Sequence, residues 1–106
     1  MTALSEQEFR LKSDAALEEA RRSLMALADE DDFEIELQNG VLNLVFEEPT
    51  ETKFVVSPNT PMRQIWVSAM AKSYKLPWSS ELQTFALGDE SLSRLLERLA
   101  RTFLEK

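Results

Sequence analysis

Residues 33–46 read FEIELQNGVLNLVF, and this stretch decides the fold. Apolar side chains alternate with glutamates from Phe33 to Leu37, which is the period expected of a strand with one buried face. Asn39-Gly40 follows, and both residue types tolerate the positive φ angles of a two-residue hairpin turn. A return strand over residues 41–46 completes the pattern, so the stretch predicts an antiparallel hairpin.

An amphipathic helix is predicted on each side of this hairpin region. Apolar residues recur at helical spacing from Ser5 to Ala28, and Ser5 with Glu8 is typical of a capping box. A second helix, capped by Asp89 or Ser91, carries one apolar stripe consisting of Leu92, Leu95, Leu96, Leu99 and Phe103. Both helices therefore have one face suited to burial against a sheet.

Further strands are predicted between the hairpin and the second helix, over residues 53–57, 64–69, 74–78 and 83–87. Residues 58–61 are expected to form a stiff connection, and residues 70–82 give the least regular pattern. The order predicts an α+β fold, a two-layer sandwich in which an antiparallel sheet of five or six strands carries both helices on one face. The expected core residues are Leu17, Leu24, Ile65, Leu95 and Leu99.

Length and composition narrow the class of protein. The chain has 106 residues without an internal repeat or low-complexity linker, so we predict one domain over residues 1–106. A net charge of -7 argues against nucleic acid and anionic membranes as partners, and no segment is long and apolar enough to span a bilayer. The first nine residues, MTALSEQEF, have no signal-peptide character, so a cytoplasmic protein is expected.

No catalytic constellation is visible in the sequence. The chain has neither histidine nor cysteine, which removes the usual general base and the thiol nucleophile. Only two glycines occur, so a phosphate-binding loop is excluded. We therefore predict that the protein is not an enzyme.

The strongest functional signal is a run of carboxylates. Six of the eight residues from position 29 to 36 are acidic: Asp29, Glu30, Asp31, Asp32, Glu34 and Glu36. Like charges this close raise the free energy of the compact state, so the run indicates a bound cation or a basic partner. The alternative is an acidic turn that is merely solvated.

The chemistry of such a metal site follows from the available ligands. Without nitrogen or sulfur donors, oxygen ligands would favour hard cations. Successive carboxylates among Asp32, Glu34 and Glu36 would lie roughly 7 Å apart along a strand. This spacing indicates several weak, water-rich sites instead of one tight site, with Glu18 and Glu19 as added ligands from the first helix.

A second signal is the position of Trp66. In RQIWVSA, residues 63–69, the indole shares a strand face with Gln64 and Ser68, and Asn43 and Val55 are expected on the same face. An outward tryptophan on an open sheet is typical of a protein-docking anchor. Alternatively, Trp66 covers its neighbours without any partner.

These features together resemble the frataxins, in particular the short bacterial kind. The resemblance is carried by the amphipathic first helix, the acidic run into FEIELQNGVLNLVF, NTPMRQIWVSA at residues 59–69 and GDESLSRLLERLA at residues 88–100. The most specific match is P-x-x-Q-I-W, from Pro61 to Trp66. Together, the matching stretches cover nearly the whole chain in the order expected of the family.

The resemblance implies an iron-binding accessory protein of iron–sulfur cluster assembly. It implies weak binding of ferrous or ferric iron by Glu18, Glu19, Asp29, Glu30, Asp31, Asp32, Glu34 and Glu36. It also implies contacts to a cysteine desulfurase and a scaffold protein through Asn59, Gln64, Trp66 and Lys75. The protein would act as an iron donor or as a regulator of that complex, with at most a weak ferroxidase activity. It would be a monomer that could oligomerise with iron.

One departure from the family pattern bears on the iron site. Frataxins usually continue the acidic ridge through the last turns of the first helix, where this chain has Arg21, Arg22, Ser23 and Met25. A second function class remains open, an acidic adaptor or secretion-type chaperone that binds a basic client without iron.

Overall fold

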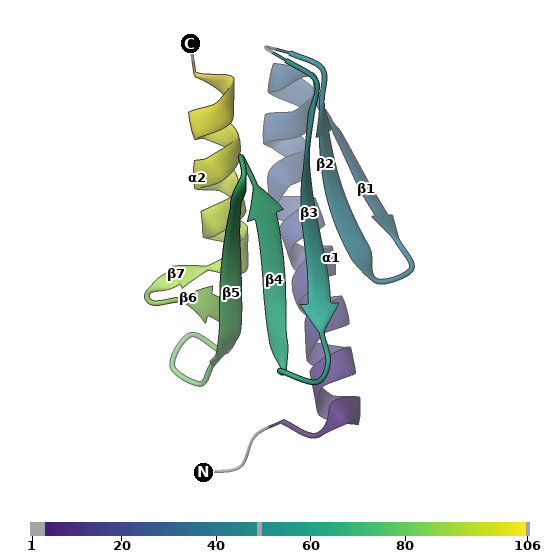
Figure 1. Ribbon diagram of the computed structural model, residues 1–106, viewed down its shortest axis with the longest axis vertical. Helices are drawn as coiled ribbons and strands as arrows, with labels where there is room; N and C mark the ends of the chain where they lie inside the picture. Colours follow the sequence, from purple (N-terminus) through teal and green to yellow (C-terminus); the bar gives the residue numbers. More distant parts are fainter. Residues whose placement is uncertain (1–3, 49, 106) are drawn as a thin grey trace.

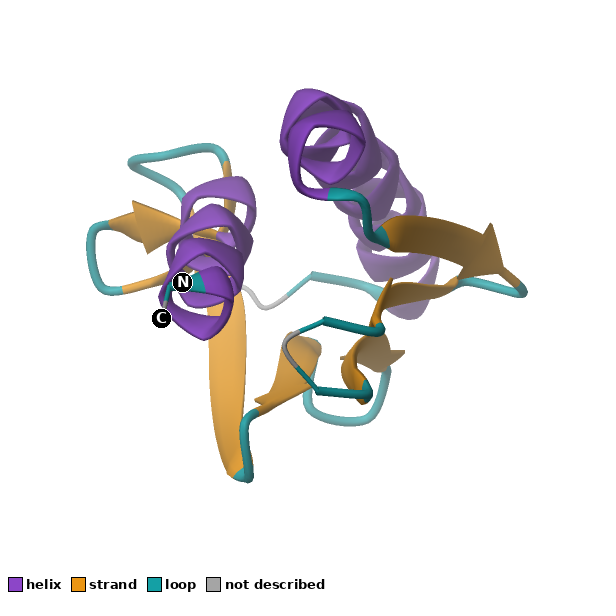
Figure 2. Ribbon diagram, turned by 90° about the horizontal axis from the view of Figure 1, so that it is seen from above, coloured by secondary structure: helices purple, strands orange, loops and turns teal. Residues whose placement is uncertain are grey.

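Two helices lie on one face of an antiparallel sheet in the computed structural model, which describes residues 4–48 and 50–105 (Figures 1 and 2). The elements are α1 (Glu6–Asp31), β1 (Glu34–Gln38), β2 (Val41–Phe46), β3 (Thr52–Asn59), β4 (Gln64–Ala69), β5 (Lys72–Ser79), β6 (Thr84–Leu87), β7 (Glu90–Ser91) and α2 (Leu92–Leu104). The strands follow one another across the sheet in chain order. The predicted two-layer sandwich is confirmed.

The sheet has more and longer strands than the sequence predicted. Over the described residues it contains seven strands instead of five or six, because the short segment Glu90–Ser91 pairs with β6. Strand β3 continues through Pro58 and Asn59, which we had predicted to be a connection. Pro58 is tolerated because the β2–β3 pairing ends at Val56, so no partner on that side needs its missing N–H.

The hydrophobic core fills the space between the helices and the sheet. All five predicted core residues are buried: Leu17, Leu24, Ile65 and Leu95 are 0% exposed and Leu99 is 3% exposed. Four aromatic rings pack beneath the end of α2, with Phe46 in contact with Phe33, Phe54 and Phe103 at centroid distances of 4.6, 4.8 and 4.8 Å. The core thus ties α2 to the strands and leaves the other sheet face open.

Two tight hairpin turns have the same backbone geometry but different sequences. Asn39 and Gly40 have φ angles of 53° and 75°, as the dipeptide predicted. Met70 and Ala71, between β4 and β5, have φ angles of 51° and 63°. Neither residue type favours this conformation, so the second turn carries no recognisable signal in the sequence.

Candidate functional site

The carboxylate run joins the end of α1 to β1. We name its six residues the acidic ridge: Asp29, Glu30, Asp31, Asp32, Glu34 and Glu36. We had predicted a turn and a strand, but α1 continues three residues beyond Ala28 and includes Asp31. Asp32 ends the helix in the left-handed conformation, with φ 60°, and its N–H donates to the Ala28 carbonyl. Half of the ridge is therefore helical.

This placement is unfavourable for the isolated fold. The C-terminal end of a helix carries a partial negative charge, which disfavours carboxylates in its last turn. The last turn of α1 contains Asp29, Glu30 and Asp31 and no basic residue. All six ridge residues are exposed. A cation or a basic partner would relieve this repulsion.

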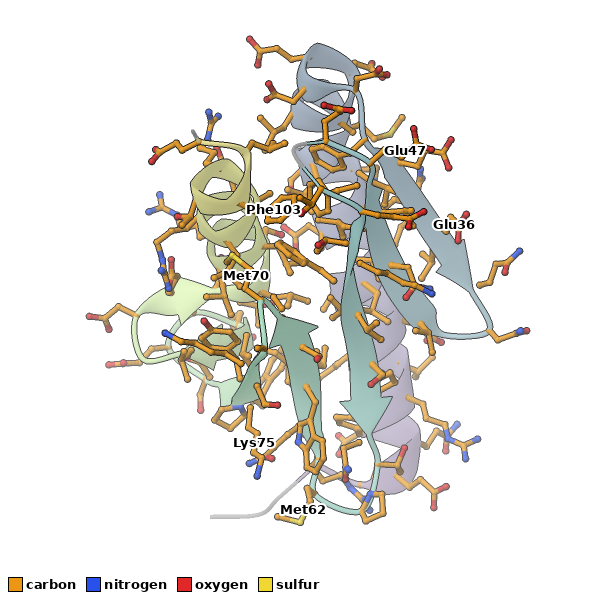
Figure 3. All side chains as sticks on the ribbon, turned by 45° about the horizontal axis from the view of Figure 1, so that its top comes forward. Glu36, Glu47, Met62, Met70, Lys75 and Phe103 are labelled. Atoms are coloured by element: carbon orange, nitrogen blue, oxygen red, sulfur yellow. The ribbon has the colours of Figure 1, made fainter. Side chains whose placement is uncertain are left out.

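The strand half of the ridge faces away from the helices. Glu34 and Glu36 pair with Val45 and Asn43 of β2, and both are exposed while the residues between and after them are half-buried. Figure 3 shows Glu36 projecting from the open face of the sheet. Glu47, the first residue after β2, is also exposed and was not among the predicted site residues.

The ridge carboxylates are spread along the surface. Among residues 4–48 and 50–105, no group of three or more acidic side chains lies close enough to hold one ion. The spacing of about 7 Å between alternate residues of a strand accounts for this on β1. Such an arrangement suits hydrated cations held by one or two carboxylates at a time.

Glu18 and Glu19 lie further back on α1. Glu18 precedes Asp29 by eleven residues, which is roughly 16 Å along a helix. The Arg21 guanidinium donates to both Glu18 oxygens, at 3.1 and 2.5 Å, and Arg22 Nε lies 3.6 Å from Oε2. The hydrogen bond from Arg21 lowers the pKa of Glu18. The structure therefore does not bring Glu18 to the ridge.

The predicted docking residues meet on the open face. The Trp66 indole N–H donates to Gln64 Oε1 at 2.9 Å, and Lys75 Nζ lies 4.9 Å from the ring centroid. Trp66 pairs with Ser57 and Lys75, and it is half-buried. Asn43 and Val55 share this face, as the strand period predicted.

Asn59 completes this group and also shapes the β3–β4 turn. It pairs with Gln64, and its Oδ1 accepts a hydrogen bond from the Met62 N–H at 3.0 Å. Arg63, which was not among the predicted site residues, donates to the carbonyls of Leu4 and Thr60 from the same turn. These contacts fix the loop beside Trp66.

The geometry defines a class of protein. The molecule is a small sandwich that presents charged and aromatic side chains on two outer surfaces, and across the described ranges no helix is long and apolar enough to cross a membrane. Residues 2–106 match the family model of the frataxin-like domain, so the chain belongs to the frataxin-like family.

Bacterial relatives support this assignment, and each is named iron-sulfur cluster assembly protein CyaY. The protein of Pseudomonas fluorescens is 28% identical over 89 residues, which cover 80% of this chain and 79% of the relative. That of Ralstonia nicotianae is 36% identical over 76 residues, covering 70% and 66%. That of Cupriavidus metallidurans is 33% identical over 76 residues, covering 70% and 67%. The name describes an assembly protein and no enzymatic activity.

The fold is also that of a solved frataxin. The structure of the frataxin from Psychromonas ingrahamii superposes with a TM-score of 0.65 and covers 93% of this chain and 91% of its own. The sequence identity is 17%, so this likeness supports the fold alone.

Proposed function

We propose that this protein is an iron-binding accessory protein of iron–sulfur cluster assembly, acting as an iron donor to, or regulator of, a cysteine desulfurase–scaffold complex. The names of its relatives support the process. The observation that carries the proposal is the exposed acidic ridge at the C-terminal end of α1. The ridge is unfavourable for the fold by itself, and a cationic ligand or basic surface would compensate for it.

Iron is the cargo in this proposal and binds weakly. The ridge offers only carboxylate oxygens, and in the part of the chain that the structure describes they do not converge in a group of three. Water would therefore complete the coordination shell, which favours exchange over storage. Glu18 contributes little, because Arg21 and Arg22 already neutralise it.

Removing the two arginines should strengthen iron binding. Replacing Arg21 and Arg22 together by glutamine frees the Glu18 carboxylate and removes two positive charges from the helix that carries the ridge. We expect a few-fold higher affinity for ferrous iron in an anaerobic titration, and a higher pKa for Glu18, since its main hydrogen-bond donor is lost. Replacing Arg10, which pairs with Glu6 near the start of α1, is the matched control and should change nothing. An unchanged affinity in the double variant would exclude Glu18 as a ligand.

Docking would use two surfaces of the molecule, the acidic ridge and the Trp66 face, which is the part of the open sheet face that carries Gln64, Trp66 and Lys75. The ridge would steer the protein to a basic groove on the desulfurase, because charges act over a distance of about 8–10 Å at physiological ionic strength. The Trp66 face would form the short-range contact on the scaffold side. By strand order, β4 lies three strands from β1, or roughly 14 Å across the sheet. One partner complex can therefore contact both surfaces at once.

Binding kinetics with the purified desulfurase–scaffold complex test this proposal. Replacing Asp29, Asp31 and Asp32 by asparagine and Glu30 by glutamine should mainly lower the association rate and flatten its dependence on salt. The dissociation rate should change much less. If the variant associates as fast as the parent protein at low salt, the ridge does not steer the complex. If the parent does not bind at all, an acidic adaptor with another client is favoured.

A further inference from the structure

The charges of this chain are strongly segregated. All 19 aspartates and glutamates lie outside residues 52–80, while that span contains Lys53, Arg63, Lys72 and Lys75. Residues 52–80 form β3, β4 and β5 with their turns. An acidic protein of net charge -7 thus has three central strands without any carboxylate. Their basic side chains attract negatively charged groups, in contrast to the ridge.

Strand β5 leaves part of one edge unpaired. It pairs with β4 from Lys72 to Pro77, but with β6 only at Trp78 and Ser79 (Figure 1). Within residues 4–48 and 50–105, no backbone hydrogen bond from a turn and no side-chain hydrogen bond reaches residues 72–77. Alternate N–H and C=O groups on the outer side of this segment are therefore open to a ligand, except at Pro77, which has no N–H.

The free edge has the length and charge to take another strand. Six residues match a typical strand, and an extended peptide that adds to such an edge gains main-chain hydrogen bonds. Lys72 and Lys75 are both exposed along it. On the neighbouring β6–β7 hairpin, Glu90 is held by Arg98 at 2.7 and 2.9 Å, so its charge is compensated.

Strand β1 at one end of the sheet favours ligands of the opposite charge. It is a terminal strand, and it carries Glu34 and Glu36. An acidic segment is therefore repelled by β1 and attracted by β5. Two copies of the β5 edge would bring their lysines together, which disfavours self-association through this edge.

We propose that the outer edge of β5, residues 72–77, binds an extended acidic segment of a partner protein by strand addition. The main-chain groups supply the hydrogen bonds, and Lys72 and Lys75 select for negative side chains on the incoming strand. This surface is distinct from the acidic ridge, and it adjoins the aromatic contact at Trp66, with which it shares Lys75.

A peptide titration followed by NMR on the full-length, iron-free protein tests this proposal. The probe is a blocked heptapeptide with glutamate at its second and fifth positions and valine or threonine elsewhere, so that one glutamate lies on each face, as Lys72 and Lys75 do on β5. The controls are its counterpart with lysine in place of glutamate and the same acidic peptide with alternate backbone nitrogens methylated. We expect amide shifts centred on residues 72–77 with the acidic probe, and little response to either control. Equal binding of the lysine peptide or of the methylated peptide would overturn strand addition to a basic edge.

Two matched lysine substitutions locate the binding. Lys72→Glu should weaken binding of the acidic peptide about threefold to tenfold, because it turns one exposed attraction into a repulsion. Lys53→Glu, an equal change at an exposed lysine of β3, should leave the affinity within about twofold. Equal effects of both variants, shifts centred on another surface, or self-association of the protein through β5 would each overturn the proposal. The experiment uses neither iron nor desulfurase, so its failure would leave the proposed function intact.

Discussion

Replacing Leu95 with alanine is expected to lower the free energy of unfolding by about 2–5 kcal/mol, measured by urea denaturation. Leu95 is 0% exposed and lies on the face of α2 that packs into the core. The loss combines the transfer free energy of the removed atoms with the cavity that remains. A small domain is stable by only about 5–15 kcal/mol, so the variant should unfold at a clearly lower urea concentration.

Leu11 provides the matched control for this substitution. It lies on α1 but is 66% exposed, so Leu11→Ala removes the same atoms from water instead of from the core. We expect a change within about 0.5 kcal/mol. Similar midpoints for Leu95→Ala and the parent protein would mean that the packing face of α2 is assigned incorrectly.

Replacing Trp66 with alanine should raise the rate of dissociation from the desulfurase–scaffold complex about thirtyfold. This corresponds to about 2 kcal/mol, the loss expected of an interfacial hot spot. The effect should appear in dissociation because an aromatic contact acts only after the complex has formed. Trp66 lies on the open face and is half-buried, so the melting temperature should change little.

For Trp78, the second tryptophan, we expect the opposite result, a change in stability without a change in the rate of dissociation. Trp78 packs edge-on against the buried ring of Phe85 at 5.3 Å, and Lys12 of α1 lies 4.6 Å from its ring centroid. Trp78→Ala should therefore lower the melting temperature and leave the dissociation rate unchanged. If Trp66→Ala unfolds easily and still binds normally, its side chain serves the fold and the docking proposal fails.

The elements that were predictable carry a periodic pattern or a specific turn residue. The Asn39-Gly40 turn fixed the first hairpin and its register, and the Ser5–Glu8 capping box begins α1 as expected. Ser91, one of the two predicted caps, accepts a hydrogen bond from the Arg94 N–H at 3.3 Å and begins α2. Local chemistry determines each of these features, so the sequence alone predicts them.

The features that escaped prediction depend on tertiary context. Nothing in Met70-Ala71 favours a left-handed turn, and the pairing of β4 with β5 imposes it. Strand β7 has two residues and exists only because β6 lies beside it. Proline in β3 is tolerated only because the pairing of β3 with β2 stops at Val56. Packing and pairing override local preference in all three places.

The site was predictable in its residues and less so in its arrangement. The composition of the ridge follows from the sequence, but its helical half does not, since three consecutive acidic residues are poor candidates for a helix C-terminus. The ion pairs of Glu18 with Arg21 and Arg22 follow from i,i+3 and i,i+4 spacing.

Calorimetric titration of the protein with ferrous iron, without oxygen, tests the central claim most directly. The variant Asp31→Asn, Asp32→Asn, Glu34→Gln removes three ridge charges, and asparagine tolerates the left-handed conformation at position 32. Its matched control, Asp14→Asn, Asp89→Asn, Glu81→Gln, removes three exposed carboxylates outside the ridge. We predict weak binding by the parent and the control, and much weaker binding by the ridge variant, whose fold is intact or more stable. Equal iron binding by the parent and the ridge variant, or none by the parent, would contradict the account.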